Sequence, residues 1–85
     1  MTNRQVDEQN AMRRYIRDRM GHLGWQIDQL MTPEQVQSYF SIRPAQLGKM
    51  RRSIQRPLKF VSVGYRTIRF KPEEILAYEW RYMVN

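Results

Sequence analysis

Apolar residues recur at helical spacing in four stretches of the chain. This spacing predicts helices over residues 7–23, 33–40, 44–54 and 72–83, each with an apolar face. Between the third and fourth helices the pattern changes to alternation, which predicts a β-hairpin with one buried and one solvent face. The sequence therefore predicts a small, mainly helical α+β domain. The positions that define the apolar faces are Met12, Ile16, Met20 and Leu23, then Val36, Tyr39 and Phe40, then Leu47, Met50 and Ile54, then Val61, Val63, Ile68 and Phe70, and last Ile75, Leu76, Tyr78, Trp80 and Met83.

Capping residues mark the start of both central helices. Thr32 is a favourable N-cap, Pro33 suits the first helical position, and Gln35 can complete a capping box. The second helix begins at Pro44 for the same reason, after a turn over residues 41–43. Two short helices joined by a turn of about three residues form a helix-turn-helix pattern.

The other turns and helix ends carry equally local signals. Gly21 and Gly24 are expected to stop the first helix, since glycine tolerates the left-handed conformation. Gly64 is expected to supply a positive φ at the hairpin tip, which also includes Tyr65 and Arg66. The last helix begins at Pro72, followed by two acids that favour the positive end of its dipole.

Positive charge is concentrated in the middle of the chain. The net charge is +7, and residues 32–71 hold nine Lys or Arg against Glu34 alone, a net of +8. A protein that binds a polyanion gathers its charge on one surface in this way, although a merely solvated basic surface has the same composition.

The basic second helix has a predictable outward face. If its apolar residues point inward, then Ala45, Lys49 and Arg52 point outward, flanked by Gln46, Gly48 and Ser53. In a DNA major groove Lys49 and Arg52 can donate to guanine, Gln46 can pair with adenine, and Ala45 can touch a thymine methyl group. The predicted base-contacting residues are therefore Ala45, Gln46, Lys49 and Arg52, with Arg51 turned toward the buried side and a phosphate.

Two segments together resemble a known family. TPEQVQSYFSIRPAQLGKMRR, followed by PLKFVSVGYRTIRFKPEEILAYEW, resembles the excisionase-type winged helix-turn-helix, which lies close to the MerR-like DNA-binding domains and to AlpA-type phage regulators. The resemblance covers roughly residues 31–80. It implies that the second helix reads DNA and that the hairpin is a wing along the DNA backbone or minor groove. The cations expected to contact phosphates or to act in the wing are Arg43, Arg51, Arg56, Arg66 and Arg69.

Three positions depart from the family pattern. Ser41 stands where a turn glycine is usual, and Arg43 where a capping Ser or Thr is usual. Gly48 lies inside the second helix, where it costs about 1 kcal/mol relative to alanine.

Residues 1–30 form an N-terminal helical extension in this interpretation, and residues 31–85 form the winged domain with its C-terminal helix. The extension can cover the core, mediate dimerisation or add phosphate contacts. The last helix has two apolar stripes and therefore needs two partners, the winged core and either the N-terminal helix or a second protomer. A possible oligomer or partner surface comprises Met12, Ile16, Leu76, Trp80 and Met83.

The leading functional hypothesis is sequence-specific binding of double-stranded DNA, as a transcription regulator or an excisionase-like recombination factor of a phage or mobile element. The resemblance implies cooperative assembly on adjacent sites and bending of the DNA. A protein-binding adaptor on the same scaffold is the alternative, and RNA binding is a third. The sequence does not distinguish regulator from excisionase or activator from repressor.

The sequence lacks the residues that several other classes of protein usually require. The chain has no cysteine and one histidine, His22, so neither a disulfide framework nor a metal site is expected. No glycine-rich phosphate loop or paired catalytic residues occur, so we expect no enzyme activity and no cofactor. Neither a signal peptide nor a membrane span is expected, and the expected location is a bacterial or phage-infected cytoplasm, which relies on the resemblance.

Overall fold

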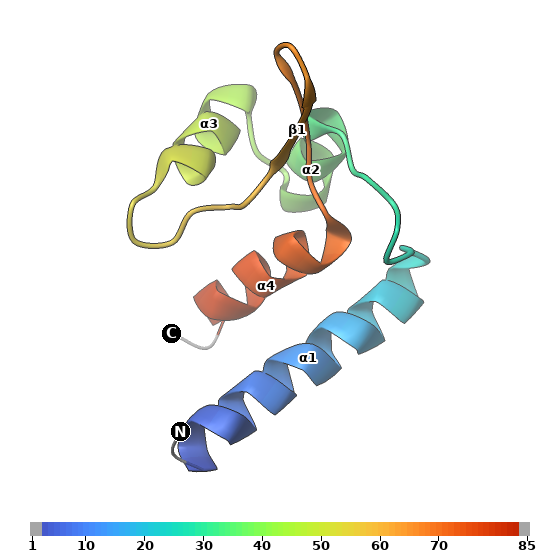
Figure 1. Ribbon diagram of the computed structural model, residues 1–85, viewed down its shortest axis with the longest axis vertical. Coiled ribbons are helices and arrows are strands. Elements are labelled where there is room, and N and C mark those ends of the chain that lie inside the picture. Colours follow the sequence, from blue (N-terminus) through green and yellow to red (C-terminus); the bar gives the residue numbers. More distant parts are fainter. Residues whose placement is uncertain (1–2, 84–85) are drawn as a thin grey trace.

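The structure is a computed structural model, which describes residues 3–83 and, within them, the side chains of residues 6–83. Four helices and one two-stranded antiparallel hairpin form a mixed α+β fold, as predicted (Figure 1). The elements in chain order are α1 (Asn3–Leu23), α2 (Pro33–Phe40), α3 (Pro44–Arg52), β1 (Val61–Gly64), β2 (Thr67–Arg69) and α4 (Pro72–Met83).

The start of α2 confirms the predicted capping box. The Thr32 side chain accepts a hydrogen bond from the Gln35 amide at 3.2 Å, and the Gln35 side chain accepts one from the Thr32 amide at 2.8 Å. At the other end of α2, Ser41 takes the left-handed conformation with φ 56°. Arg43 is the N-cap of α3 and makes no side-chain capping bond, as its departure from the usual Ser or Thr predicts.

One hydrophobic core joins α2, α3, α4 and the segments around the hairpin. Val36, Leu58, Phe70 and Ile75 are fully buried, and Leu47 is 3% exposed. Leu58 was not predicted to be in the core, because it lies in the irregular segment after α3. Its amide donates to the Met50 carbonyl at 3.0 Å, which fixes that segment against α3.

The chain before α2 pairs with the chain after β2. Met31 and Phe70 exchange two backbone hydrogen bonds, of 2.8 and 2.9 Å, in an isolated antiparallel bridge. Both side chains are buried, Met31 at 3% exposed and Phe70 completely. This bridge fixes the base of the hairpin next to the start of α2.

The predicted inward position of Ile54 is wrong. Helix α3 ends at Arg52, two residues earlier than the pattern predicted, and Ser53 is extended with ψ 133°. Ile54 therefore leaves the helical register, and its side chain is 96% exposed.

The hairpin also differs from the prediction. Val61 pairs with Arg69, and Ser62 pairs with Ile68. Residues directly opposite each other share a face, so Val61 does not lie on the same face as Ile68. A bulge between Ser62 and Gly64 leaves Val63 52% exposed.

At the hairpin tip, the residue with positive φ is Arg66, at 60°, and not Gly64 as predicted. Arg66 is one of two non-glycine residues with positive φ among residues 3–83. The tip therefore depends on a strained residue whose side chain is exposed.

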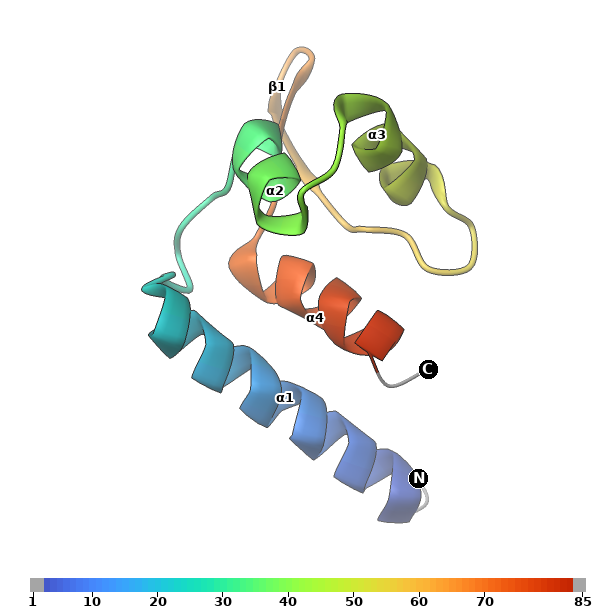
Figure 2. The same ribbon diagram turned by 180° about the vertical axis from the view of Figure 1, so that it is seen from behind.

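Helix α1 begins earlier than predicted and packs against α4 (Figures 1 and 2). The rings of Tyr15 and Trp80 lie 5.4 Å apart between the two helices. Gly24, with φ 74°, ends the helical region as predicted, whereas Gly21 lies within α1 and does not stop it. The Trp25 amide donates back to the Met20 carbonyl at 2.9 Å. Trp80, from the second apolar stripe of α4, thus meets the N-terminal helix of the same chain.

Candidate nucleic-acid interface

The exposed face of α3 contains the four residues predicted to contact bases. Ala45, Gln46, Lys49 and Arg52 are all exposed, whereas Leu47 on the other side is buried. The four predicted base-contacting residues therefore lie on the exposed side of α3, as expected. Pro44 occupies the first helical position of α3, and the burial of Leu47 in the core turns the opposite face of the helix outward.

Gly48 is buried, although it was predicted to flank the exposed face. The Arg52 guanidinium folds back over it, because a Cβ built on Gly48 would lie 3.2 Å from Arg52 Nη1 and 3.4 Å from Nη2. The glycine therefore leaves room for the Arg52 side chain to fold back along the helix.

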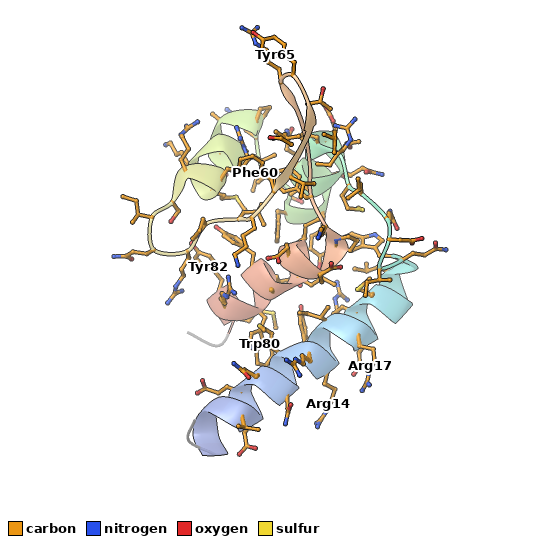
Figure 3. The ribbon with its side chains drawn as sticks, viewed as in Figure 1. Arg14, Arg17, Phe60, Tyr65, Trp80 and Tyr82 are labelled. Carbon is orange, nitrogen blue, oxygen red and sulfur yellow. The ribbon has the colours of Figure 1, made fainter. Side chains whose placement is uncertain are left out.

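The hairpin tip presents two exposed residues at the end of the molecule. Tyr65 is 86% exposed, and the Arg66 guanidinium lies 5.1 Å from the centre of its ring (Figure 3). Arg69, which was also assigned to the wing, is half-buried and donates from Nη1 to the Ile68 carbonyl at 2.7 Å. Arg66 is thus the more accessible of the two predicted wing cations.

Two further predicted phosphate-contacting residues lie over aromatic rings. The Arg51 guanidinium is 5.2 Å from the centre of the Phe60 ring, and the Arg56 guanidinium is 5.5 Å from that of Tyr82. Both arginines are half-buried, and Arg51 lies toward the inner side of α3 as expected. Arg43, the fifth predicted phosphate contact, is exposed at the start of α3. Aromatic rings are uncharged, so these contacts leave the positive charges of Arg51 and Arg56 in place.

Helix α3 and the hairpin lie at the same end of the long axis, and α1 lies at the other end (Figures 1 and 2). Two cations of α1, Arg14 and Arg17, point away from the body of the protein at that other end (Figure 3). The fold therefore brings the most basic part of the sequence to one end, around α3 and the hairpin.

The five residues predicted to form an oligomer or partner surface do not form one exposed surface. Leu76 is fully buried within the chain, and Met12, Ile16 and Trp80 are half-buried where α1 packs against α4. Met83 alone among them is largely exposed, at 61%.

A polar cluster between α1, α2 and α4 was not predicted. Glu79 accepts hydrogen bonds from the hydroxyl of Tyr39, at 2.8 and 2.9 Å to its two oxygens, and from the hydroxyl of Tyr15. Arg19 donates from Nη2 to the Tyr39 hydroxyl at 3.1 Å. These residues are up to 64 positions apart, so no local sequence signal could have revealed the cluster.

The cluster changes the acid–base properties of its members. Partial burial, followed by the hydrogen bond to Glu79, raises the pKa of Tyr15 to about 12. Burial also raises the pKa of Tyr39, against the opposing effect of Arg19. Both hydroxyls therefore keep their protons in the folded protein and donate to the carboxylate, which fastens α1 to α2 and α4.

Within residues 3–83, no three His, Asp or Glu side chains are arranged to hold a metal ion. None of the helices described is long and apolar enough to cross a membrane. Comparison of the chain with protein-family models, curated proteins and solved structures gave no match.

Proposed function

We propose that the chain is a sequence-specific double-stranded DNA-binding protein with a winged helix-turn-helix. In this proposal α2 and α3 are the helix-turn-helix, α3 enters the major groove, and the β1–β2 hairpin is the wing. The biological role would be that of a transcription regulator or an excisionase-like architectural factor of a phage or mobile element, as the sequence resemblance implies.

One observation carries the proposal. The exposed residues Gln46, Lys49 and Arg52 project from a short helix at the same end of the molecule as the exposed Arg66 of the hairpin. Side chains of these types supply the donors that distinguish bases in the major groove, and a second cation beside them can hold the phosphate backbone. The surrounding residues 32–71 contain a single acid, Glu34, which limits repulsion of a polyanion.

Affinity and specificity would come from different residues. Phosphate neutralisation by the cations would supply most of the affinity and make it strongly salt-dependent. Contacts from α3 to base edges would supply the sequence preference. A single module of this size buries little surface, so adjacent copies on repeated sites would strengthen binding.

The test is selection of bound duplexes from a random pool, followed by titration of the preferred duplex over a range of salt concentrations. Lys49→Ala or Arg52→Ala should weaken binding to the preferred duplex by roughly 1–3 kcal/mol and relax its base preference. Arg66→Ala should instead weaken all duplexes about equally and reduce the salt slope by about 1.

Arg14→Ala is the matched control, because it removes the same charge at the opposite end of the molecule (Figure 3). It should leave binding and base preference unchanged. Loss of affinity in Arg14→Ala as large as in Arg52→Ala would show that net charge, and not this surface, determines binding. An absence of binding even at low salt would refute the proposed function.

A further inference from the structure

A groove lies on the surface between α2, α3 and α4. Its volume is about 600 Å³, and residues of all three helices line it. Small-molecule sites in proteins commonly enclose about 300–1,000 Å³ and combine apolar walls with a few polar groups. The groove therefore lies within the size range of small-ligand sites.

Aromatic side chains form much of the wall. Phe40 and Tyr78 meet edge to face with ring centres 5.9 Å apart, and the rings of Tyr78 and Tyr82 lie 4.8 Å apart. Tyr78 is 8% exposed, whereas Tyr82 is 54% exposed. Ile42 and Met50 add apolar surface. The partly exposed Tyr82 ring and the edges of its neighbours give the groove an aromatic wall against which a flat apolar group can pack.

The two charged residues that line the groove differ in how well their charges are satisfied. Glu79 already accepts hydrogen bonds from Tyr15 and Tyr39. Lys49, in contrast, makes no hydrogen bond or ion pair with any residue that the structure describes. Of the two charged groups at the groove, the Lys49 ammonium is therefore the one that can pair with an anion.

We infer that this groove binds a small aromatic carboxylate, with the ring against Phe40, Tyr78 and Tyr82 and the carboxylate paired with Lys49. The apolar walls favour the ring by removing its surface from water. The ammonium of Lys49 favours the carboxylate through a charge-assisted hydrogen bond. A neutral ligand of the same shape would gain only the first of these contributions.

Binding of this ligand would also affect the proposed DNA surface. Gln46 and Lys49 line the groove and belong to the outward face of α3. A carboxylate paired with Lys49 removes one cation from that face, so the ligand should weaken binding to duplex DNA. This consequence rests on the proposed function, whereas the ligand site itself does not.

The site is tested by following backbone amide chemical shifts during titration with phenylpropionate and, separately, with the neutral phenylpropanamide. The carboxylate should bind saturably at the groove and about tenfold more tightly than the amide. Lys49→Met, which keeps the apolar stem and removes the charge, should abolish this preference. Lys59→Met is the matched control, because Lys59 is an exposed lysine outside the groove, and it should leave the preference intact.

Three results would overturn the inference: no saturable shift at the groove up to about 10 mM ligand, equal affinity for acid and amide, or an unchanged preference in Lys49→Met. Groove resonances that shift with protein concentration alone would show that a second copy covers the groove, which also overturns it.

Fluorescence anisotropy of a labelled duplex then tests the consequence separately. Phenylpropionate should release the duplex from the native protein but not from Lys49→Met. If the native protein binds no duplex at all, the proposed function fails while the titration still decides the ligand site.

Discussion

Gly48→Ala tests the unusual glycine in the middle of α3. Glycine in a helix interior is less favourable than alanine by about 0.8–1.0 kcal/mol, because it loses more backbone freedom on folding. Gly48 has no positive φ that would require glycine. The substitution should therefore stabilise the fold unless the added methyl group has no room.

The structure indicates that room can be made. The new Cβ would lie 3.2 Å from Arg52 Nη1, which is tighter than usual, so the guanidinium must withdraw by a few tenths of an ångström. Arg52 is exposed, and its guanidinium is the far end of a flexible side chain, so the movement costs little. We expect a net gain of about 0.5–1 kcal/mol in the free energy of unfolding, and a rise of several degrees in Tm for a domain of this size.

Thermal unfolding followed by circular dichroism measures this change. Gly21→Ala is the control, since nothing lies within 4 Å of its added Cβ, and it reports helix propensity alone in the last turn of α1. A fall in Tm for Gly48→Ala beside a rise for Gly21→Ala would refute the reasoning, because it would mean that Arg52 cannot move aside. Weaker DNA binding by a stabilised Gly48→Ala would show that the folded-back position of Arg52 matters for recognition.

Three other predictions concern the fold. Glu79→Ala should lower the free energy of unfolding by roughly 1–3 kcal/mol, because it leaves two tyrosine hydroxyls without an acceptor. It should also speed amide hydrogen exchange in α1, and unchanged exchange there would contradict this prediction. Ser41→Gly should raise the free energy of unfolding by up to about 1 kcal/mol, because Ser41 has φ 56°, a conformation that glycine adopts more readily. The control Ser38→Gly, within α2, should lower the free energy of unfolding by a similar amount, and urea denaturation measures both changes. The pKa of Tyr15, raised to about 12, means that the folded protein holds this proton more tightly than the unfolded chain does. The free energy of unfolding should thus fall as pH rises from about 10 to about 12, and it should fall less in Tyr15→Phe. Equal falls in the two proteins over this same pH range would contradict the assignment.

Local signals were sufficient for most of the elements. Thr32, Pro33 and Gln35 act within one turn of helix, so their capping box could be predicted from three residues. Pro44 likewise marks the start of α3, and the apolar positions of that helix predict the exposure of Lys49 and Arg52. These features depend on groups close in sequence, which the pattern alone contains.

Hairpin register could not be predicted in the same way. The alternation of Val61 and Val63 suggested one buried face, but the strand pairing places Val61 opposite Arg69. A bulge of one residue moves side chains to the other face of a strand, and nothing in the local pattern marks its position. Arg66, and not Gly64, takes the positive φ because the observed two-residue turn places it there.

The sequence by itself determined the class of the fold, the four helices, the outward face of α3 and the concentration of charge in residues 32–71. Only the tertiary structure decided that α1 packs on α4 through Tyr15 and Glu79, that Leu58 completes the core, and that Lys49 borders a groove shared by three helices. The physical reason is the range along the chain over which each interaction acts. Helix propensity, capping and charge act between near neighbours, whereas packing and hydrogen bonding between distant residues depend on how whole elements meet in space.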